Sequence, residues 1–258
     1  MSKKRLVVAN WKMYIKSPER AVAFARALRR KARVFPGVSV VIAPAFTLIP
    51  PVASVLKGSS LHLGAQTLSP FADDKRTGEV GAALLKHAGV SFVVIGHSER
   101  RATGETDEVI RAELRAAAGE GLIPILCVGE KERDQGGNHF SAIARQLSTV
   151  LGEKTSKNNI KRLVVAYEPV WAIGKEAGDA MRPAELRETV IFIRKTLADI
   201  LGRKEALRTA ILYGGSVEPE NAASLIAEGG VAGFLVGHAS VDVDTFLPIL
   251  KATRQGSR

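Results

Sequence analysis

The sequence predicts a single-domain α/β fold in which eight strand and helix units close into a (β/α)8 barrel. Runs of apolar and β-branched residues lie at 5–10, 38–43, 60–65, 91–96, 122–128, 162–167, 208–213 and 231–236. These runs lack polar alternation, which is typical of strands buried on both faces of a parallel sheet. The length of 258 residues also suits a one-domain barrel.

The segments between these runs carry the apolar spacing of amphipathic helices, most clearly at 21–28, 109–116 and 186–200. Ser17-Pro18-Glu19 and Pro183-Ala184-Glu185 resemble helix starts, because proline is favoured in the first helical turn. No linker or shift in composition divides the chain. We therefore predict one domain over residues 1–258, with a frayed tail at 253–258.

The composition indicates a globular protein, with 46% hydrophobic and 24% charged residues. The amino-terminal segment lacks the apolar run of a signal peptide or a membrane span, so we expect a cytoplasmic protein with no membrane partner. Cys127 is the single cysteine. It allows no intrachain disulfide and no cysteine cage for a metal, and we expect it to be a small buried residue.

The net charge of +11 raises the question of a nucleic-acid partner. Aromatic residues make up only 5% of the chain, and the basic residues are scattered through helical stretches such as 26–31. The stacking platforms of single-strand binders are therefore missing. We interpret most of the charge as solvated helix faces and expect no nucleic-acid partner.

Polar side chains follow three of the predicted strands at their carboxyl ends. Lys12 follows the first strand, His97 the fourth and Glu168 the sixth. In a barrel these ends meet on one face. A carboxylate there can take a proton from a carbon beside a carbonyl, a neutral imidazole can donate to the carbonyl oxygen, and an ammonium can stabilise an enediolate.

That combination predicts aldose–ketose isomerisation without a metal or a cofactor. Each residue taken singly has another explanation: Lys12 as a surface residue, His97 as an interior histidine, Glu168 as the partner of an arginine. His62, His87 and His139 have no metal-ligand spacing.

Glycines beyond the last three strands indicate an anion site. They are Gly174, Gly214-Gly215 before Ser216, and Gly237. Glycine lets backbone N–H groups approach an anion closely, and barrel enzymes often bind phosphate after strands seven and eight. A tight turn explains any one of these glycines, but it explains the set less well.

Two connections are longer than a simple turn requires: residues 66–79 and the segment after Glu168. Long loops inside a compact domain are often functional, so we expect a lid or a subunit contact there. A merely flexible loop is the alternative.

Five motifs at separate strand ends resemble the triosephosphate isomerase family, in order and over essentially the whole chain. They are Asn10-Trp11-Lys12-Met13, Gly64-Ala65-Gln66, Ile95-Gly96-His97-Ser98-Glu99-Arg100-Arg101, Tyr167-Glu168-Pro169-Val170-Trp171-Ala172-Ile173-Gly174 and Tyr213-Gly214-Gly215-Ser216-Val217. The resemblance implies a TIM barrel that interconverts dihydroxyacetone phosphate and D-glyceraldehyde 3-phosphate in glycolysis and gluconeogenesis.

The resemblance also implies roles for individual residues. Glu168 would be the base and His97 the electrophile, while Lys12 with Asn10 would stabilise the enediolate. The histidine of this family is a known example of an imidazole kept neutral by a helix amino terminus, and residues 98–100 would begin that helix here.

For the phosphate, the resemblance implies backbone N–H donors at Gly174, Ser216, Gly237 and His238, beneath a lid that starts at Pro169. Loop 66–79 would insert into a second subunit and bring Thr77 close to the partner's Asn10. A homodimer is therefore implied.

The chain departs from the family pattern at several positions. Lys175 and Glu176 replace the usual Thr-Gly after Gly174, so the lid tip differs. His238 replaces the second of two glycines, and histidine is among the few other residues that could hold the same backbone at positive φ. We expect its ring to face solvent; the alternative is a protonated ring that adds positive charge near the phosphate. Tyr14 and Thr67 stand where asparagine is usual, and we expect both to affect the dimer side more than the chemistry.

These departures leave two alternatives to a triose-phosphate isomerase. One is an isomerase of a four-carbon ketose phosphate such as erythrulose phosphate. The other is a non-catalytic barrel that binds a sugar phosphate.

Overall fold

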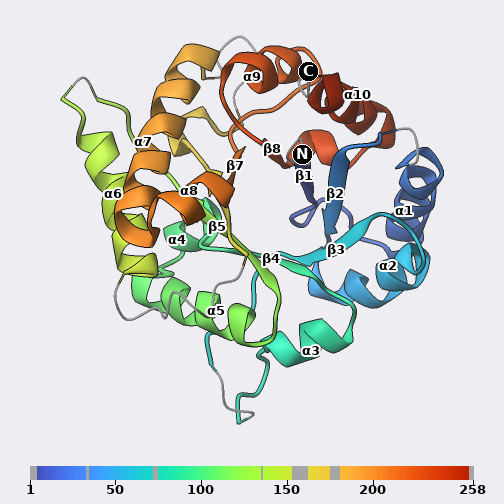
Figure 1. Cartoon of the computed structure of the whole chain (residues 1–258). Helices are drawn as coiled ribbons and strands as arrows, with labels where there is room; N and C mark the ends of the chain where they lie inside the picture. The colour runs from blue at the N-terminus through green and yellow to red at the C-terminus, as the bar shows by residue number, and fades with distance from the viewer. Residues whose placement is uncertain are drawn as a thin grey trace.

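The predicted barrel is confirmed by a computed structural model, which describes residues 5–32, 35–71, 75–134, 136–152, 162–174 and 181–255. Eight parallel strands follow one another in sequence order around a closed barrel, and β8 pairs with β1 to complete it. Helices surround the barrel as an outer layer (Figure 1). The chain is thus a single-domain (β/α)8 TIM barrel.

Each predicted strand is present, and its carboxyl end agrees with the prediction within one residue. The strands are β1 (Arg5–Asn10), β2 (Val38–Ala43), β3 (His62–Ala65), β4 (Phe92–Ile95), β5 (Ile123–Val128), β6 (Val164–Tyr167), β7 (Ala210–Tyr213) and β8 (Gly233–Val236). The amino ends are less well predicted, because apolar residues of the preceding turns continue the pattern. The carboxyl ends matter more here, since they carry the polar residues.

The helices follow the predicted periodicity. They are α1 (Pro18–Ala32), η1 (Phe46–Leu48), α2 (Ile49–Leu56), α3 (Ala82–His87), α4 (Ser98–Ala102), α5 (Asp107–Gly119), α6 (Asn138–Leu151), η2 (Val170–Ala172), α7 (Pro183–Leu201), α8 (Arg203–Arg208), α9 (Ala222–Glu228), η4 (His238–Ser240) and α10 (Val243–Gln255). Both predicted starts are confirmed: Ser17 Oγ accepts the Arg20 N–H, and α7 begins at Pro183. None of the described helices is long and apolar enough to cross a membrane.

The predicted frayed tail is wrong for residues 253–255. Helix α10 continues to Gln255, and Thr253 is fully buried with its hydroxyl donating to the Ile249 carbonyl at 2.8 Å. The buried positions Phe246, Ile249 and Leu250 continue to Thr253, so the buried face of the helix extends into its last turn. Residues 256–258 lie outside the described residues.

Two apolar layers hold the barrel together, because neighbouring residues of a strand point to opposite faces. On β1, Leu6 and Val8 point into the barrel, whereas Val7 and Ala9 pack against the helices. Cys127 belongs to the inner layer and is fully buried, as expected. Its burial raises the pKa of the thiol, with a further contribution from the charge of Glu168.

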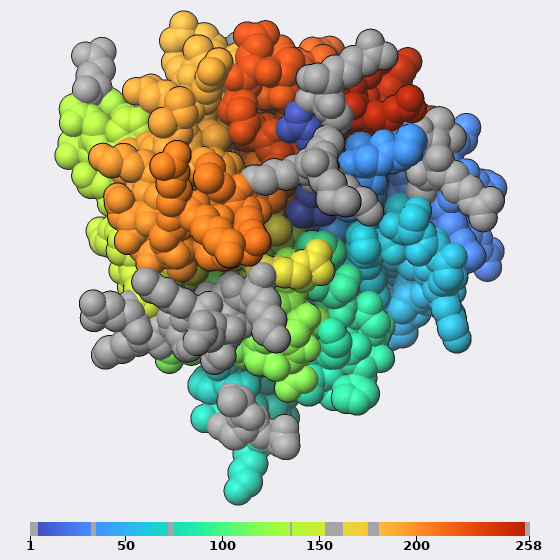
Figure 2. Space-filling view, in the orientation of Figure 1, coloured from blue at the N-terminus to red at the C-terminus, as the bar shows by residue number. Residues whose placement is uncertain are grey.

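The long connection after β3 forms an arm that projects from the body of the molecule (Figures 1 and 2). Its base is closed by a hydrogen bond from the Ser69 N–H to the Val80 carbonyl at 2.9 Å. Beyond this base, the Arg76 guanidinium lies 4.1 Å from the centre of the Phe71 ring. Thr77 is exposed in a turn of the arm. Residues 72–74 lie outside the described residues.

Helix α5 buries a carboxylate in an unusual setting. Glu113 is fully buried, and its Oε1 accepts a hydrogen bond from the Thr67 hydroxyl at 3.2 Å. Glu113 Oε2 and Glu105 Oε2 have no hydrogen-bond partner within the described part of the chain. Burial, followed by the charge of Glu105, raises the pKa of Glu113 to about 8. Thr67 therefore supplies a hydrogen bond to the buried Glu113.

Glu113→Gln should change how stability depends on pH. Folded Glu113 keeps its proton up to about pH 8, whereas an unfolded glutamate loses it near 4.5. The unfolded state therefore binds fewer protons between these values, and stability falls as pH rises, by at most about 1.4 kcal/mol per pH unit. Glutamine cannot ionise, so the variant should gain stability relative to the parent as pH rises from 5.5 to 8.5.

Urea unfolding at several pH values measures this difference. Glu120→Gln, at an exposed position just after α5, is the matched control and should show no such trend. Parallel pH profiles for Glu113→Gln and the parent protein would contradict the assignment.

Candidate active site

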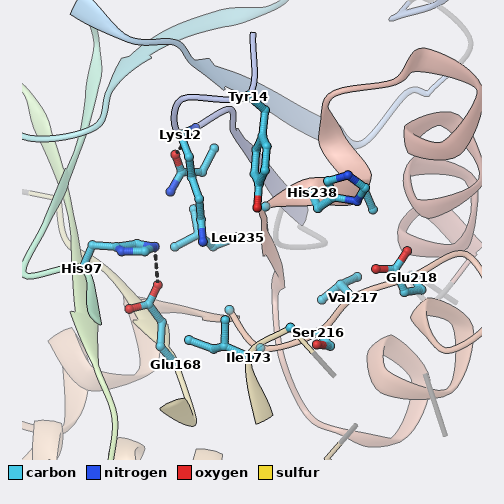
Figure 3. A pocket seen from close by; sticks show the side chains of 16 residues that line it. Lys12, Tyr14, His97, Glu168, Ile173, Ser216, Val217, Glu218, Leu235 and His238 are labelled. Atoms are coloured by element: carbon cyan, nitrogen blue, oxygen red, sulfur yellow. Dashed lines mark hydrogen bonds and ion pairs between the residues drawn. The ribbon is translucent and has the colours of Figure 1, made fainter. Parts of the chain in front are cut away.

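The carboxyl ends of the strands surround one cavity of about 320 Å³ (Figure 3). All three predicted catalytic residues line it: Lys12, His97 and Glu168. The predicted substrate-binding residues also line it, namely Asn10, Gly174, Ser216, Gly237 and His238. Thr77 does not line this cavity and lies on the arm described above. Lys175 and Glu176 lie outside the described residues.

His97 is held in one tautomer by the start of helix α4. Its Nδ1 accepts the backbone N–H of Glu99 at 3.2 Å, so this nitrogen carries no proton. The ring proton then belongs on Nε2, which lies 3.2 Å from Glu168 Oε1. The geometry therefore presents a neutral imidazole whose N–H points into the cavity toward Glu168 (Figure 3).

Glu168 follows β6 and is only 2% exposed. One carboxylate oxygen accepts the Ser98 N–H at 2.8 Å, and the other faces His97. Gly129 and Gly214 leave room for Glu168, because neither carries a Cβ. A Cβ at Gly214 would lie 2.9 Å from Glu168 Cγ, and a Cβ at Gly129 would lie 1.8 Å from the Glu168 carbonyl oxygen. Gly129 escaped the sequence analysis because only its spatial neighbour explains it.

Lys12 has a strained backbone that places its side chain in the cavity. Its φ is +44°, and it is the one non-glycine residue of the described chain with positive φ. Its N–H donates to Asn10 Oδ1 at 3.1 Å, and its carbonyl accepts from Gln66 Nε2 at 3.0 Å. Its ammonium lies 2.7 Å from Glu99 Oε1. Asn10 thus shapes the turn that aims Lys12.

The segment after Glu168 is anchored to a buried carboxylate. Glu130 is 2% exposed, and its Oε1 accepts hydrogen bonds from the Tyr167 hydroxyl and Trp171 Nε1, both at 2.8 Å. Burial raises the pKa of Tyr167, so its hydroxyl keeps the proton that it donates. Farther along, the Ala172 carbonyl accepts from Ser216 Oγ at 2.9 Å. The beginning of the expected lid is thus tied at both sides.

At the far end of the cavity lies His238, which departs from the family pattern. His238 begins the 3-10 helix η4 and has no positive φ, so it does not use the left-handed backbone that histidine tolerates. The preceding Gly237 makes the turn, and η4 continues with ordinary dihedrals. The His238 ring is exposed, as expected, but it also meets the Tyr14 ring edge-on, with centroids 5.2 Å apart. Tyr14 also lines the cavity.

Within the described chain, no three His, Cys, Asp or Glu side chains gather as a metal site. What the structure brings together is a carboxylate, a neutral imidazole and an ammonium around one cavity at the carboxyl ends of the strands. Fold and site together define a (β/α)8-barrel protein equipped for proton transfer on a small molecule.

Comparison with known proteins places the chain within this class. Residues 5–253 match the model of the family described as triosephosphate isomerase. Relatives named triosephosphate isomerase include those of Symbiobacterium thermophilum, 41% identical over 97% of both chains, and Carboxydothermus hydrogenoformans, 41% identical over 97% of this chain and 99% of the other. A third, from Treponema denticola, is 42% identical over 96% and 98%. The chain belongs to the triosephosphate isomerase family.

Gly214→Ala should displace Glu168 while leaving the fold intact. The added Cβ would lie 2.9 Å from Glu168 Cγ, and position 214 does not require positive φ. Misplacing a catalytic group by about 1 Å costs up to about a hundredfold in rate, so we expect isomerase turnover to fall at least about tenfold. Thermal unfolding should change little.

Gly119→Ala is the matched control, because a Cβ there would enter open space in the described structure. Turnover of Gly214→Ala equal to that of the control would show that Glu168 does not depend on this gap.

Proposed function

We propose that the protein interconverts dihydroxyacetone phosphate and D-glyceraldehyde 3-phosphate, as a step of glycolysis and gluconeogenesis. One observation carries the proposal: Glu168 Oε1 and His97 Nε2 lie 3.2 Å apart in a cavity that also contains the Lys12 ammonium. Membership of the triosephosphate isomerase family supports the same reaction. We propose no cofactor.

Glu168, His97 and Lys12 suit both the removal of the proton from one carbon and its return to the next. Glu168 takes a proton from the carbon beside the substrate carbonyl and returns it to the neighbouring carbon. The His97 N–H donates to the oxygen on which negative charge develops, and the Lys12 ammonium stabilises that charge. Asn10 contributes by fixing the Lys12 turn through its side-chain oxygen. Substrate and product differ only in the positions of two protons, so the step needs no other reactant.

We assign phosphate binding to backbone N–H groups at the opposite end of the cavity. The donors are Gly174, Ser216, Gly237 and His238, in the loops after β6, β7 and β8. Closure of the segment that begins at Pro169 would exclude water from the enediolate. The anchoring of this segment to Glu130 and Ser216 supports a lid in this position.

Glu168→Gln tests the reaction and the base together. The amide keeps the size of the side chain but cannot take the proton, so turnover of glyceraldehyde 3-phosphate should fall about 10²-fold to 10⁴-fold. Binding of a phosphate-bearing substrate analogue, measured by calorimetry, should change little. Glu120→Gln serves as the control variant. Full activity of Glu168→Gln would remove Glu168 from its proposed role.

The unmodified protein should be assayed with L- and D-erythrulose phosphates alongside the triose. Tyr14 and His238 on the cavity wall make a change of substrate range worth testing. Turnover of a tetrulose phosphate without turnover of the triose would assign the four-carbon reaction. Phosphate binding without any turnover would indicate a sugar-phosphate-binding barrel, although such a protein would have no need of the Glu168–His97 pair.

We also propose a cytoplasmic homodimer without nucleic-acid or membrane partners. Met13, beside Lys12 in sequence, is 82% exposed, and Phe71 on the arm is 42% exposed. Large apolar side chains exposed in this way suit a surface that a second subunit covers. The projecting arm that carries Thr77 is the element proposed to reach the partner (Figure 2).

Thr77→Arg should weaken the dimer and the activity together, because a large charged side chain would enter the proposed subunit contact. Analytical ultracentrifugation gives the mass, and the triose assay gives the turnover. Ser148→Arg, an exposed change on α6, controls for the added charge. A fully active monomer would refute the claim that the partner completes the site.

A further inference from the structure

Two residues that depart from the family pattern meet on the cavity wall. The Tyr14 and His238 rings lie at 74° to one another with centroids 5.2 Å apart, an edge-to-face contact. Tyr14 comes from the turn after β1, where its N–H donates to the Trp11 carbonyl at 3.0 Å. His238 comes from the loop after β8. Residues from opposite ends of the chain thus form one wall (Figure 3).

This contact does not serve the apolar core. Tyr14 is 43% exposed and the His238 ring is also exposed, whereas Trp11, three residues before Tyr14, is fully buried against Phe24. Both rings instead line the cavity. Their arrangement therefore bears on what the cavity holds.

The charges around the cavity favour a role for His238. Of the described residues that line it, Lys12 is the one lysine and none is arginine, while Glu168 and Glu218 supply carboxylates. The Lys12 ammonium is already paired with Glu99 at 2.7 Å. This ammonium also lies near the Gly237 end, since a Cβ at Gly237 would be 3.9 Å from Lys12 Nζ. Among the described lining residues, Lys12 is thus the one lysine or arginine that a phosphate dianion meets there. An imidazole on that wall can supply an N–H donor and, when protonated, a positive charge.

Glu218 faces the same end of the cavity as His238 (Figure 3). Its burial, followed by the charge of Glu220, raises its pKa, whereas His238 acts in the opposite direction. Among the described residues, Tyr14 from the turn after β1 contacts the His238 ring, and Glu218 from the loop after β7 interacts with it electrostatically. Lys12 lines the same cavity. A carboxylate here would repel phosphate, and a cationic His238 would offset it.

We infer that His238 is a side-chain ligand for the phosphate group of the substrate and that Tyr14 is its positioning residue. This inference rests on the proposed function for the identity of the substrate, and it adds a side-chain contact to the backbone donors. His238 binds through its ring N–H, and Tyr14 holds that ring in place through the T-shaped contact between the two rings.

Direct binding of inorganic phosphate tests the inference without turnover. His238→Gly keeps the backbone N–H and removes the whole side chain, restoring the glycine that is usual at this position in the family. Charge-assisted hydrogen bonds are worth more than neutral ones, less so when exposed, so we expect phosphate binding to weaken about three- to tenfold at pH 6. The comparison is repeated at pH 8, and the weakening should be smaller there, because a cationic imidazole binds phosphate more strongly than a neutral one. Comparing variant with parent at each pH cancels the titration of phosphate itself.

Tyr14 variants separate positioning from direct binding. Tyr14→Ala should weaken phosphate binding to the same extent as His238→Gly, and the double variant should bind no more weakly than His238→Gly alone. Tyr14→Phe keeps the ring and should restore the binding lost in Tyr14→Ala. His87→Ala, on α3 outside the cavity, is the control for loss of a histidine.

NMR titration with inorganic phosphate gives the affinities, and circular dichroism verifies that each variant is folded. In the triose assay, KM of His238→Gly should rise while kcat falls much less. Unchanged phosphate affinity of His238→Gly at pH 6, or losses that multiply in the double variant, would overturn the inference. Because the phosphate titration requires no catalysis, it decides this point even if the protein proves inactive toward trioses.

Discussion

Pairing of β8 with β1 makes the eight parallel strands a closed ring, and all of them must then end on the same rim. Everything that the site contains depends on this closure. Lys12, His97 and Glu168 are far apart in the sequence, yet each needs only to follow a strand end to reach the cavity. The inner and outer apolar layers keep the ring rigid enough to hold atoms such as His97 Nε2 and Glu168 Oε1 at a defined separation.

The three buried glutamates of this structure discussed above differ in their hydrogen-bond partners. Glu168 keeps one oxygen on the Ser98 N–H and the other near His97 at the cavity, as its proposed role of base requires. Glu130 is occupied by Tyr167 and Trp171, so it serves as an anchor for the chain beyond Glu168. Glu113 has few partners, and burial keeps it protonated to about pH 8. Glu168 and Glu130 each face two donors and differ in where those donors lie, whereas Glu113 accepts from Thr67 alone among the described residues and has a raised pKa.

The site also depends on the volume left free around Glu168 and on the backbone conformation of Lys12. Gly129 and Gly214 are required because Glu168 occupies the volume where their Cβ atoms would lie. Lys12 adopts a strained backbone that Asn10 and Gln66 hold from two sides. The strain lies at the point where the ammonium must enter the cavity, which is typical of functional sites.

The sequence by itself determined the barrel, the carboxyl ends of its strands and the catalytic candidates. Apolar runs without alternation mark buried parallel strands, and a polar residue such as Asn10 or Glu168 marks where each run stops. The sequence could not show that Trp171 meets Glu130, 41 residues away, or that His238 meets Tyr14. It also left the backbone of His238 open, where the tertiary structure begins a 3-10 helix without positive φ. Periodicity records how each segment faces the core, whereas these contacts depend on which loops the closed barrel brings together, and only the tertiary structure decided that.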